Sequence, residues 1–311
     1  MAGFRKIDGF LTKNNHELRN IKMLKGIKAE IYLLLIVIIW GSTFAMTKDV
    51  LSSMPPYTFL GFRFAIAVLL LIILFWKRLK GLNIMILRKG SLIGLFLFLG
   101  YMFQTVGIQY TSATKAGFIT GLSVVLVPII SFVIIKEKPT MNSIIGVVLA
   151  TLGLWFLNYN GSSSFNFGDF LVLLCAFSFA MHITSVGLYS KKLDYVLLVI
   201  VQLIAVTVLS FLIALIVERP ALHFYYSYNI WGAVAFMAIF ATALAFYMQN
   251  RFQRHSTATK TAIIFSGEPL FSGIFGYIML GEQLGLIAWL GGLSIILGMI
   301  VSQQNLDTQT S

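Results

Sequence analysis

Apolar segments long enough to cross a lipid bilayer follow one another along most of this sequence. A membrane-spanning helix needs about 20 mostly apolar residues, and we find ten such segments. Their centres lie near Trp40, Leu69, Tyr101, Leu126, Gly146, Ala180, Val206, Ile239, Pro269 and Leu293. Only 11% of the residues are charged, against about 25% in a soluble domain. The sequence therefore predicts an all-α membrane protein with ten transmembrane helices.

The distribution of the basic residues predicts how these helices are oriented. When the N-terminus is placed in the cytoplasm and the helices alternate, 19 of the 23 Lys and Arg residues fall on cytoplasmic segments. Membrane proteins carry such an excess on their cytoplasmic loops. The net charge of +12 is thus a topology signal, and we expect a lipid bilayer and no nucleic acid as partner. We predict a multi-pass protein of the inner (plasma) membrane with both termini cytoplasmic.

The second half of the sequence repeats the first at an offset of 145 residues. Ser-Ala-Thr-Lys at 112–115 returns as Thr-Ala-Thr-Lys at 257–260. At an offset of 135 residues, Phe-Ala-Met at 44–46 returns at 179–181. The matched pairs at 145 include Gln104 and Gln249, Lys115 and Lys260, Glu137 and Glu282, Gly146 and Gly291, and Gly153 and Gly298.

The repeat predicts two five-helix units, residues 29–160 and 161–303. A basic cytoplasmic N-terminal tail (1–28) precedes them, and a cytoplasmic C-terminal tail (304–311) follows. Because five is an odd number, the second unit enters from the opposite side of the membrane, so the two units are inverted. Inverted repeats are typical of secondary transporters, whose substrate site lies at the repeat interface near the midplane. We therefore expect ten transmembrane helices as two inverted five-helix repeats around a central cavity.

Several short motifs resemble the drug/metabolite transporter superfamily, in its ten-helix EamA branch. They are WGSTF from Trp40, RFAIAVLLL from Arg63, YTSATKAGF from Tyr110, GEPLF from Gly267 and LGEQL from Leu280. The resemblance implies a cavity lined mainly by the third, fourth, eighth and ninth helices, with contributions from the first and sixth. The family includes exporters of amino acids and other metabolites, and more distant relatives move sugar nucleotides or sugar phosphates. Pro128 and Pro269 depart from the repeat by one helical turn, so the two half-sites are not strict copies.

Glu268 is the most informative candidate for substrate binding or transport. It lies near the middle of the ninth predicted helix, directly before Pro269. A charged carboxylate at that depth costs about 2.5–3.5 kcal/mol on insertion scales and indicates function. It can exchange a proton or pair with a substrate amine; the alternative is a neutral Glu that holds a neighbouring helix. Proton coupling through Glu268 and uncoupled facilitated diffusion fit the sequence equally well.

Other polar and aromatic side chains within the predicted helices are candidate substrate contacts. His182 lies on a polar stripe of the sixth helix, and the repeat-related amides Gln104 and Gln249 project from the third and eighth. The remaining candidates for the cavity wall are Trp40, Ser42 and Tyr101. For each of them the alternative is a contact that only packs or bonds helix to helix.

Charged residues at the helix ends are candidates for a second role. Lys115 and Lys260 begin the fourth and ninth helices at opposite membrane faces. We consider them possible electrostatic gates for anionic solutes, with snorkelling to the interface as the alternative. Arg63 lies about 10 Å inside the second helix at 1.5 Å per residue, and we interpret it as structural.

Motifs of catalysis and metal binding are missing from the sequence. It contains no GxxxxGK[ST], no HExxH and no CxxC, so we expect neither an enzyme nor a metal or cofactor. We predict a transporter of small molecules, most simply an exporter of amino acids or similar zwitterionic or cationic solutes, working by alternating access. The alternatives are an importer of sugars, carboxylates or phosphorylated metabolites, and a membrane-embedded enzyme or scaffold. The oligomeric state is open.

Overall fold

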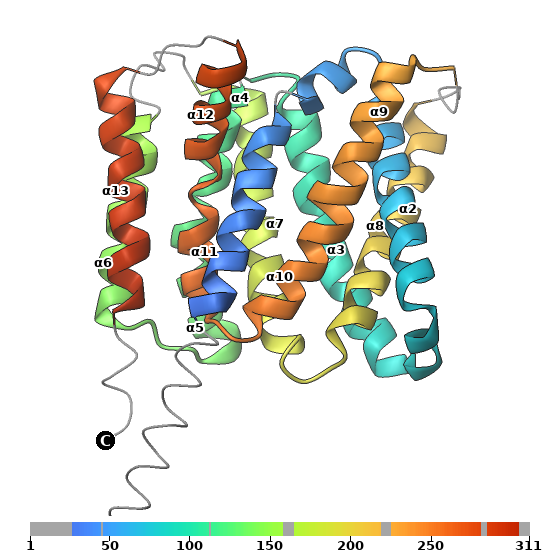
Figure 1. The fold of residues 1–311 in the computed structure, drawn as a ribbon, viewed down its shortest axis with the longest axis horizontal. Helices are drawn as coiled ribbons and strands as arrows, with labels where there is room; N and C mark the ends of the chain where they lie inside the picture. The colour runs from blue at the N-terminus through green and yellow to red at the C-terminus, as the bar shows by residue number, and fades with distance from the viewer. Residues whose placement is uncertain are drawn as a thin grey trace, which may run out of the picture.

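The helices of the computed structural model run up and down a single bundle (Figure 1). The structure describes residues 27–44, 46–111, 113–157, 165–218, 225–280 and 285–304. The helices are a first span (Ile27–Leu51), α2 (Pro56–Phe75), the 3₁₀ turn η1 (Trp76–Gly81), α3 (Ile84–Gly107), α4 (Ala113–Gly121), α5 (Ser123–Ile135), α6 (Met141–Leu157), α7 (Phe167–Tyr189), α8 (Tyr195–Val217), α9 (Tyr228–Phe236), the π-helix η2 (Met237–Leu244), α10 (Ala245–Gln253), α11 (Ala258–Phe265), α12 (Glu268–Leu280) and α13 (Leu286–Gln303).

Eight helices in these ranges are long and apolar enough to cross a membrane. This confirms the prediction of an all-helical, multi-pass membrane protein. The fifth predicted span is the shorter apolar helix Met141–Phe156. The ninth is divided into α11 and α12 by a break at Ser266 and Gly267. Ten separate transmembrane helices therefore remain a prediction.

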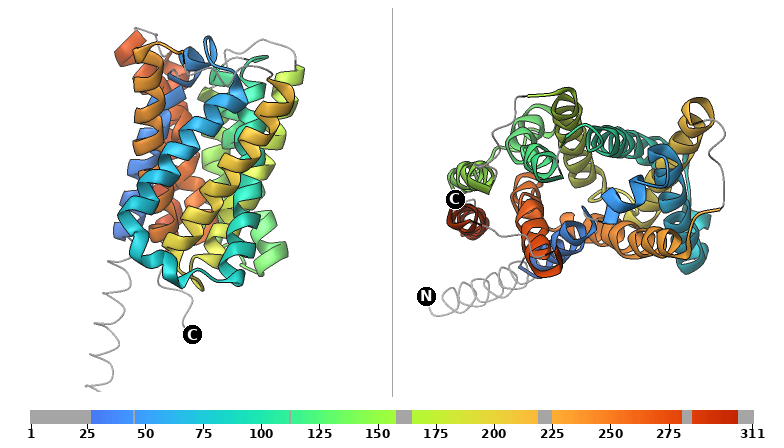
Figure 2. Two further views of the ribbon diagram at one scale, coloured as in Figure 1. Left: turned by 90° about the vertical axis from the view of Figure 1, so that its right-hand side faces the viewer. Right: turned by 90° about the horizontal axis from the view of Figure 1, so that it is seen from above.

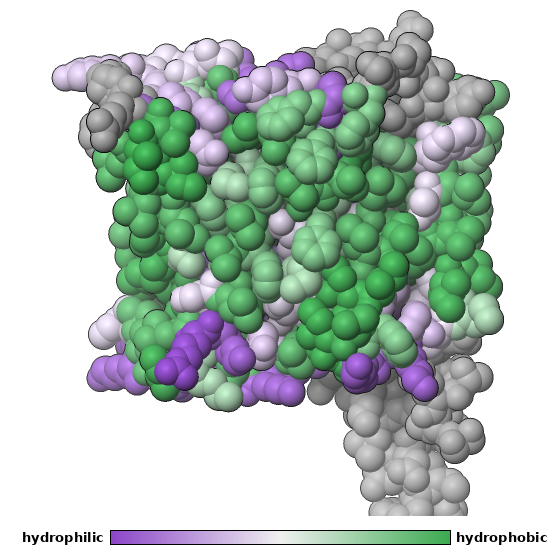
Figure 3. Space-filling model, turned by 180° about the vertical axis from the view of Figure 1, so that it is seen from behind, coloured by the Kyte–Doolittle hydropathy of each residue, from purple (hydrophilic) through white to green (hydrophobic). Residues whose placement is uncertain are grey.

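The surface of the bundle has the layered polarity that a bilayer requires. An apolar belt covers the middle of the face seen in Figure 3, and hydrophilic side chains follow its lower edge. We call the end of the bundle at Ile27 and Gln303 the lower end, and the opposite one the upper end. Exposed basic residues of the lower end include Lys77, Arg78, Lys80, Arg88, Lys191, Lys192 and Arg251.

Side-chain caps mark where several of these helices begin. The Asn83 side chain accepts a hydrogen bond from the backbone at the start of α3, and Asp194 does so at α8. Asn166 and Asp169 form a reciprocal capping box at α7. Each cap satisfies backbone N–H groups that have no partner within the helix.

Two helices are interrupted at positions related by the 145-residue repeat. The α4–α5 segment breaks at Leu122, and the α11–α12 segment breaks at Ser266 and Gly267. A proline lies inside α5 at Pro128, whereas Pro269 is the second residue of α12, just after the second break. Broken helices in a membrane are tolerated where neighbouring protein covers the freed backbone.

Glycines bring α6 and α13 into close contact. A Cβ built on Gly146 would lie 2.8 Å from the Gly298 carbonyl oxygen, and one on Gly153 would lie 2.5 Å from that of Gly291. The two helices therefore run antiparallel and touch through backbone, as their small-residue faces predict. They lie together at one edge of the bundle, α6 in green and α13 in red (Figure 2).

Two apolar cores fill the bundle, and Trp40 packs against both. One joins α2, α3, α8 and the α9–η2–α10 segment, and it includes Phe59, Phe64 and Phe246. The other joins the first span to α5, α6, α11 and α13. Trp40 lies between them, near the middle of the first span. The space next to Trp40 is consequently enclosed by both groups of helices.

The contact between α6 and α13 predicts a position-specific effect of adding one methyl group. Gly153→Ala should destabilise the protein by about 1–3 kcal/mol, the usual range for overpacking, because the new Cβ meets backbone that cannot rotate away. Gly232→Ala is the matched control, since a Cβ there has no neighbour within 4 Å. Thermal unfolding of the purified protein measures both variants. Equal melting temperatures for the two would contradict this account.

Candidate functional site

A central cavity with an empty volume of about 560 Å³ lies between the two apolar cores. Six residues predicted as substrate contacts line it: Trp40, Tyr101, Gln104, His182, Gln249 and Glu268. They come from the first span, α3, α7, α10 and α12. Residues up to 228 positions apart in the sequence are thus brought to one cavity.

A second, smaller cavity continues from the first toward the upper end. The two share Trp40, Tyr101, Gln104 and Glu268. The second has an empty volume of about 380 Å³, and its wall is more polar. Its other lining residues are Thr43, Phe44, Thr47, Arg63, Thr105 and Ile108.

Aromatic rings form much of the wall of the central cavity. The ring of Trp40 lies 5.6 Å from Phe246 and 5.1 Å from Phe265, measured between ring centroids. Tyr101 packs edge-to-face on Phe179 at 5.4 Å. These faces offer an apolar surface of fixed shape to whatever enters the cavity.

The π-helix η2 holds the first span and α2 in place. A π-helix bonds five residues apart and is common at functional sites. The Ala241 carbonyl accepts a hydrogen bond from Trp40 Nε1 at 2.9 Å and a longer one from Arg63 Nη2 at 3.5 Å. The indole donor of Trp40, which the sequence suggested for substrate, is therefore already engaged.

Arg63 is buried, with 3% of its surface exposed, yet it lines the second cavity. Its Nε donates to Thr242 Oγ1 at 2.8 Å. Its guanidinium carbon lies 5.2 Å from the centre of the Tyr101 ring, close enough for a cation–π contact. The residue is thus anchored structurally, as expected, and it also places a positive charge at the cavity wall.

Glu268 is the first residue of α12, directly after the break in the ninth predicted span. Its side chain lines both cavities. In the described part of the chain, no hydrogen bond is made to its carboxylate. Arg63 lines the second cavity as well, but the Arg63 and Glu268 side chains form no direct ion pair.

The polar side chains of the central cavity differ in how many of their polar atoms have a hydrogen-bond partner. His182 Nε2 and Gln202 Oε1 of α8 are 2.9 Å apart, an interhelical hydrogen bond. Gln104 Nε2 donates to Thr120 Oγ1 at 3.2 Å. Gln249 Nε2 donates to Gln253 Oε1 at 3.2 Å, but Gln249 Oε1 has no partner.

Ser42 is not brought to either cavity. Its hydroxyl donates to the Ile39 carbonyl at 2.7 Å, within the same helix. The first span is close to α12 here, because a Cβ on the neighbouring Gly41 would lie 2.7 Å from that of Phe271. Ser42 is absent from the residues that line the two cavities, so its role in the cavity wall stays a prediction.

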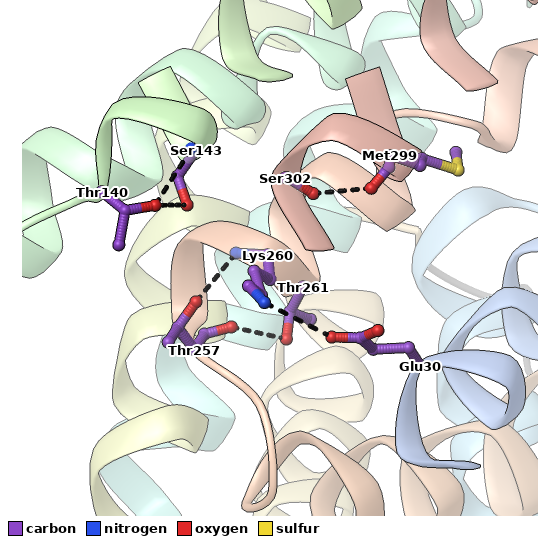
Figure 4. Close-up of polar contacts among 8 residues, drawn as sticks. All are labelled: Glu30, Thr140, Ser143, Thr257, Lys260, Thr261, Met299 and Ser302. Atoms are coloured by element: carbon purple, nitrogen blue, oxygen red, sulfur yellow. Dashed lines mark hydrogen bonds and ion pairs between the residues drawn. The ribbon is translucent and has the colours of Figure 1, made fainter. Parts of the chain in front are cut away.

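Lys260 is buried at the lower end and does not snorkel. Its Nζ lies 3.9 Å from Glu30 Oε1 of the first span, and the two side chains are about a tenth exposed (Figure 4). Thr257 caps α11 by accepting from the Lys260 backbone N–H. Lys115 falls in the first turn of α4; its side chain and Glu282 lie outside the described residues.

Further contacts lie at the lower end, below the cavity. The rings of Tyr32 and Phe252 stack with centroids 4.1 Å apart. Glu137, beyond the end of α5, faces the start of α11. Burial raises the pKa of the Glu137 carboxyl above its ordinary value, although Lys191 and hydrogen bonds from Thr257 and the first amides of α11 act in the opposite direction.

Two residues of this arrangement were missed by sequence reasoning. Glu30 pairs with Lys260 across 230 positions, and an acidic side chain at the start of an apolar segment was its only signal. Gln253 is fully buried and donates to the Ile183 carbonyl at 2.7 Å. Its spacing of four residues from Gln249 places both on one helix face.

The fold defines a multi-pass membrane protein with a central cavity lined by residues from several of its helices. Comparison with known proteins identifies the family. The model of the EamA-like transporter family matches residues 27–159 and 166–303. The chain belongs to the EamA-like transporter family, and it is a transporter.

Individual relatives and a solved structure agree with this assignment. An uncharacterized transporter of Archaeoglobus fulgidus is 37% identical over 278 residues, which are 89% of this chain and 86% of that protein. The uncharacterized transporter YyaM of Bacillus subtilis is 25% identical over 294 residues, 90% of this chain and 94% of that protein. A crystal structure with 17% sequence identity superposes with a TM-score of 0.71, covers 88% of this chain and 96% of its own, and shows the same fold.

The anchoring of Arg63 predicts a large effect of a nearly isosteric substitution. Thr242→Val should destabilise the protein by about 1–3 kcal/mol, because it leaves a buried charged donor without its acceptor. Thr207→Val is the control, since that hydroxyl bonds only to the Leu203 carbonyl of its own helix. Thermal unfolding measures both; a loss no greater at Thr242 than at Thr207 would contradict the anchoring role.

Proposed function

We propose that this transporter exports small zwitterionic or cationic metabolites, amino acids foremost, by alternating access through the central cavity. The observation that best supports this proposal is that Arg63 and Glu268 line the same cavity without forming an ion pair. A buried charge is costly unless it is paired. A solute with both an ammonium and a carboxylate group supplies a partner to each.

The walls of the cavity support a solute that is partly apolar. Aromatic rings of the first span, α3, α10 and α11 surround the central cavity. Such rings also attract cations, so they favour an amine beside an apolar side chain. A polyanion such as a phosphorylated metabolite would contact Glu268 and this apolar surface. Among the residues that line the two cavities, Arg63 is the only Lys or Arg that could balance its negative charge.

The contacts of α6 and α13 support the two inverted repeats, 29–160 and 161–303. Under the 145-residue offset, Gly146 corresponds to Gly291 and Gly153 to Gly298. The contact of Gly146 with Gly298 then maps onto that of Gly291 with Gly153, as a two-fold axis requires. The equivalent breaks after α4 and α11 support the same relation. Ten helices in two inverted units give the fold the means for alternating access.

The closed lower end supports a state in which the cavity faces the upper side. Lys260 and Glu30 are buried together there, and Gln253 is buried beside α7. The exposed basic residues of the same end support a cytoplasmic location of the lower end and both termini, in the inner membrane. The upper end would then face the outside of the cell, the side on which an exporter releases its solute.

Ligand-induced stabilisation tests the proposed substrate class. A ligand that binds only the folded protein at 100 times its Kd stabilises it by about 2.7 kcal/mol. We expect amino acids to raise the melting temperature of the purified protein, and sugars and sugar phosphates to leave it unchanged. Glu268→Gln should abolish the shift, whereas Asp49→Asn, which removes an exposed carboxylate at the upper end, should retain it.

Efflux from loaded cells tests the direction. Cells loaded with a radiolabelled amino acid that stabilises the protein should lose it faster when the wild type is expressed than when Glu268→Gln is. Stabilisation by sugars alone, or an export rate that Glu268→Gln does not change at equal expression, would refute the proposal.

A further inference from the structure

A chain of hydrogen bonds leads from the wall of the central cavity to the backbone of α7. Gln249 Nε2 donates to Gln253 Oε1 at 3.2 Å. Gln253 Nε2 donates to the carbonyl of Ile183 at 2.7 Å. Gln249 lines the cavity, and Gln253 lies one turn below it on the same helix.

The direction of this chain is set by its last member. A backbone carbonyl only accepts hydrogen bonds, whereas an amide side chain has a donating and an accepting end. The Ile183 carbonyl therefore requires the NH₂ of Gln253, which turns the oxygen of Gln253 toward Gln249. That oxygen in turn requires the NH₂ of Gln249. The remaining end of Gln249 is its oxygen, the atom that has no partner.

Close packing holds Gln253 in this orientation. The residue is fully buried. A Cβ on Gly187 of α7 would lie 3.3 Å from Gln253 Nε2, so α7 approaches the amide closely at this point. Gln253 consequently has little freedom to turn its amide over.

Two of the residues that line the cavity therefore carry an acceptor that lacks a donor. One is Gln249 Oε1, on a residue with 1% of its surface exposed. The other is the Glu268 carboxylate, to which the described residues make no hydrogen bond. A buried acceptor without a partner is unfavourable, and a group with several N–H donors can satisfy two acceptors at once. An ammonium group has three donors and no acceptor.

We propose that Gln253 is a specificity-determining residue, which fixes Gln249 with its oxygen free so that Gln249 and Glu268 together bind the ammonium group of the substrate. This inference rests on the proposed transport of amino acids and adds a residue outside the cavity to their recognition. The first half has no equivalent: the 145-residue counterpart of Gln253 is Ile108, and Gln104 donates to a hydroxyl that both donates and accepts. Recognition of the amine is thus a property of the second half.

Matched pairs of solutes separate recognition of the amine from binding in general. The probes are L-alanine with L-lactate and L-phenylalanine with L-phenyllactate, in which a hydroxyl replaces the ammonium group. Affinities come from thermal shifts of the full-length protein in detergent, titrated with each probe. The measured quantity is the ratio of the two dissociation constants within a pair, for the wild type and each variant.

The variants are Gln253→Leu, Gln249→Leu and a control. Gln253→Leu frees the Gln249 amide to rotate, and Gln249→Leu removes its oxygen altogether. The control is Asn250→Leu, a buried amide whose Nδ2 donates to the Phe246 carbonyl of its own helix and which lines neither cavity. Thermal unfolding without probe shows which variants fold.

We expect the wild type to bind the amino acid of a pair at least tenfold more tightly than the hydroxy acid. Gln253→Leu and Gln249→Leu should each reduce this ratio about tenfold, the loss of one hydrogen bond to a charged group, while Asn250→Leu retains it. An unchanged ratio in Gln253→Leu, or an equal loss for both members of a pair, would overturn the role of Gln253. If Gln253→Leu does not fold, Gln253→Met, which is similar in length and lacks the amide, decides by the same criterion. A wild type stabilised by neither member of either pair would instead refute the proposed substrate class, and with it this inference.

Discussion

The carbonyl of Ala241 is the point on which the geometry of the cavity depends. In the interior of a membrane every backbone polar group needs a protein partner, and this carbonyl lies within the π-helix η2. Trp40 of the first span and Arg63 of α2 both donate to it. One acceptor thus orients the largest ring of the central cavity and the buried cation of the second cavity. The walls of the site are positioned by hydrogen bonds between helices rather than by apolar contact alone.

Much of this arrangement could be predicted from the sequence, because apolar composition indicates the membrane spans and the spacing of matched residues indicates the repeat. Glu268, Gln104, Gln249, His182, Tyr101 and Trp40 all line the central cavity, as polar or aromatic residues within apolar segments should. The pattern could not show the direction of each side chain. Ser42 lies two residues from Trp40, but it is absent from the lining of both cavities and its hydroxyl bonds within its own helix.

Contacts between distant segments account for what sequence reasoning missed. A π-helix differs from an α-helix by a shift of one hydrogen bond, and Met237–Leu244 carries no proline or glycine that would indicate it. The ion pair of Lys260 with Glu30 joins the first span to the ninth, so neither residue alone revealed that both are buried. In the sequence, Gln253 is one more polar residue near a basic loop. Its importance follows from its hydrogen bond to the Ile183 carbonyl. Every residue has such a backbone carbonyl, so the residue type gives no sign of this contact.

The π-helix also sets the two halves of the cavity apart. Its counterpart in the first half, residues 92–99, lies within the regular helix α3. A cavity built from two identical halves would bind an asymmetric solute in two opposite orientations with equal affinity. Half of the binding events would then place each group of the solute at the wrong wall. In this protein a π-helix lies on one side of the cavity and a regular α-helix on the other. The irregularity therefore makes the two walls inequivalent, so that opposite orientations of an asymmetric solute would not be equal in energy.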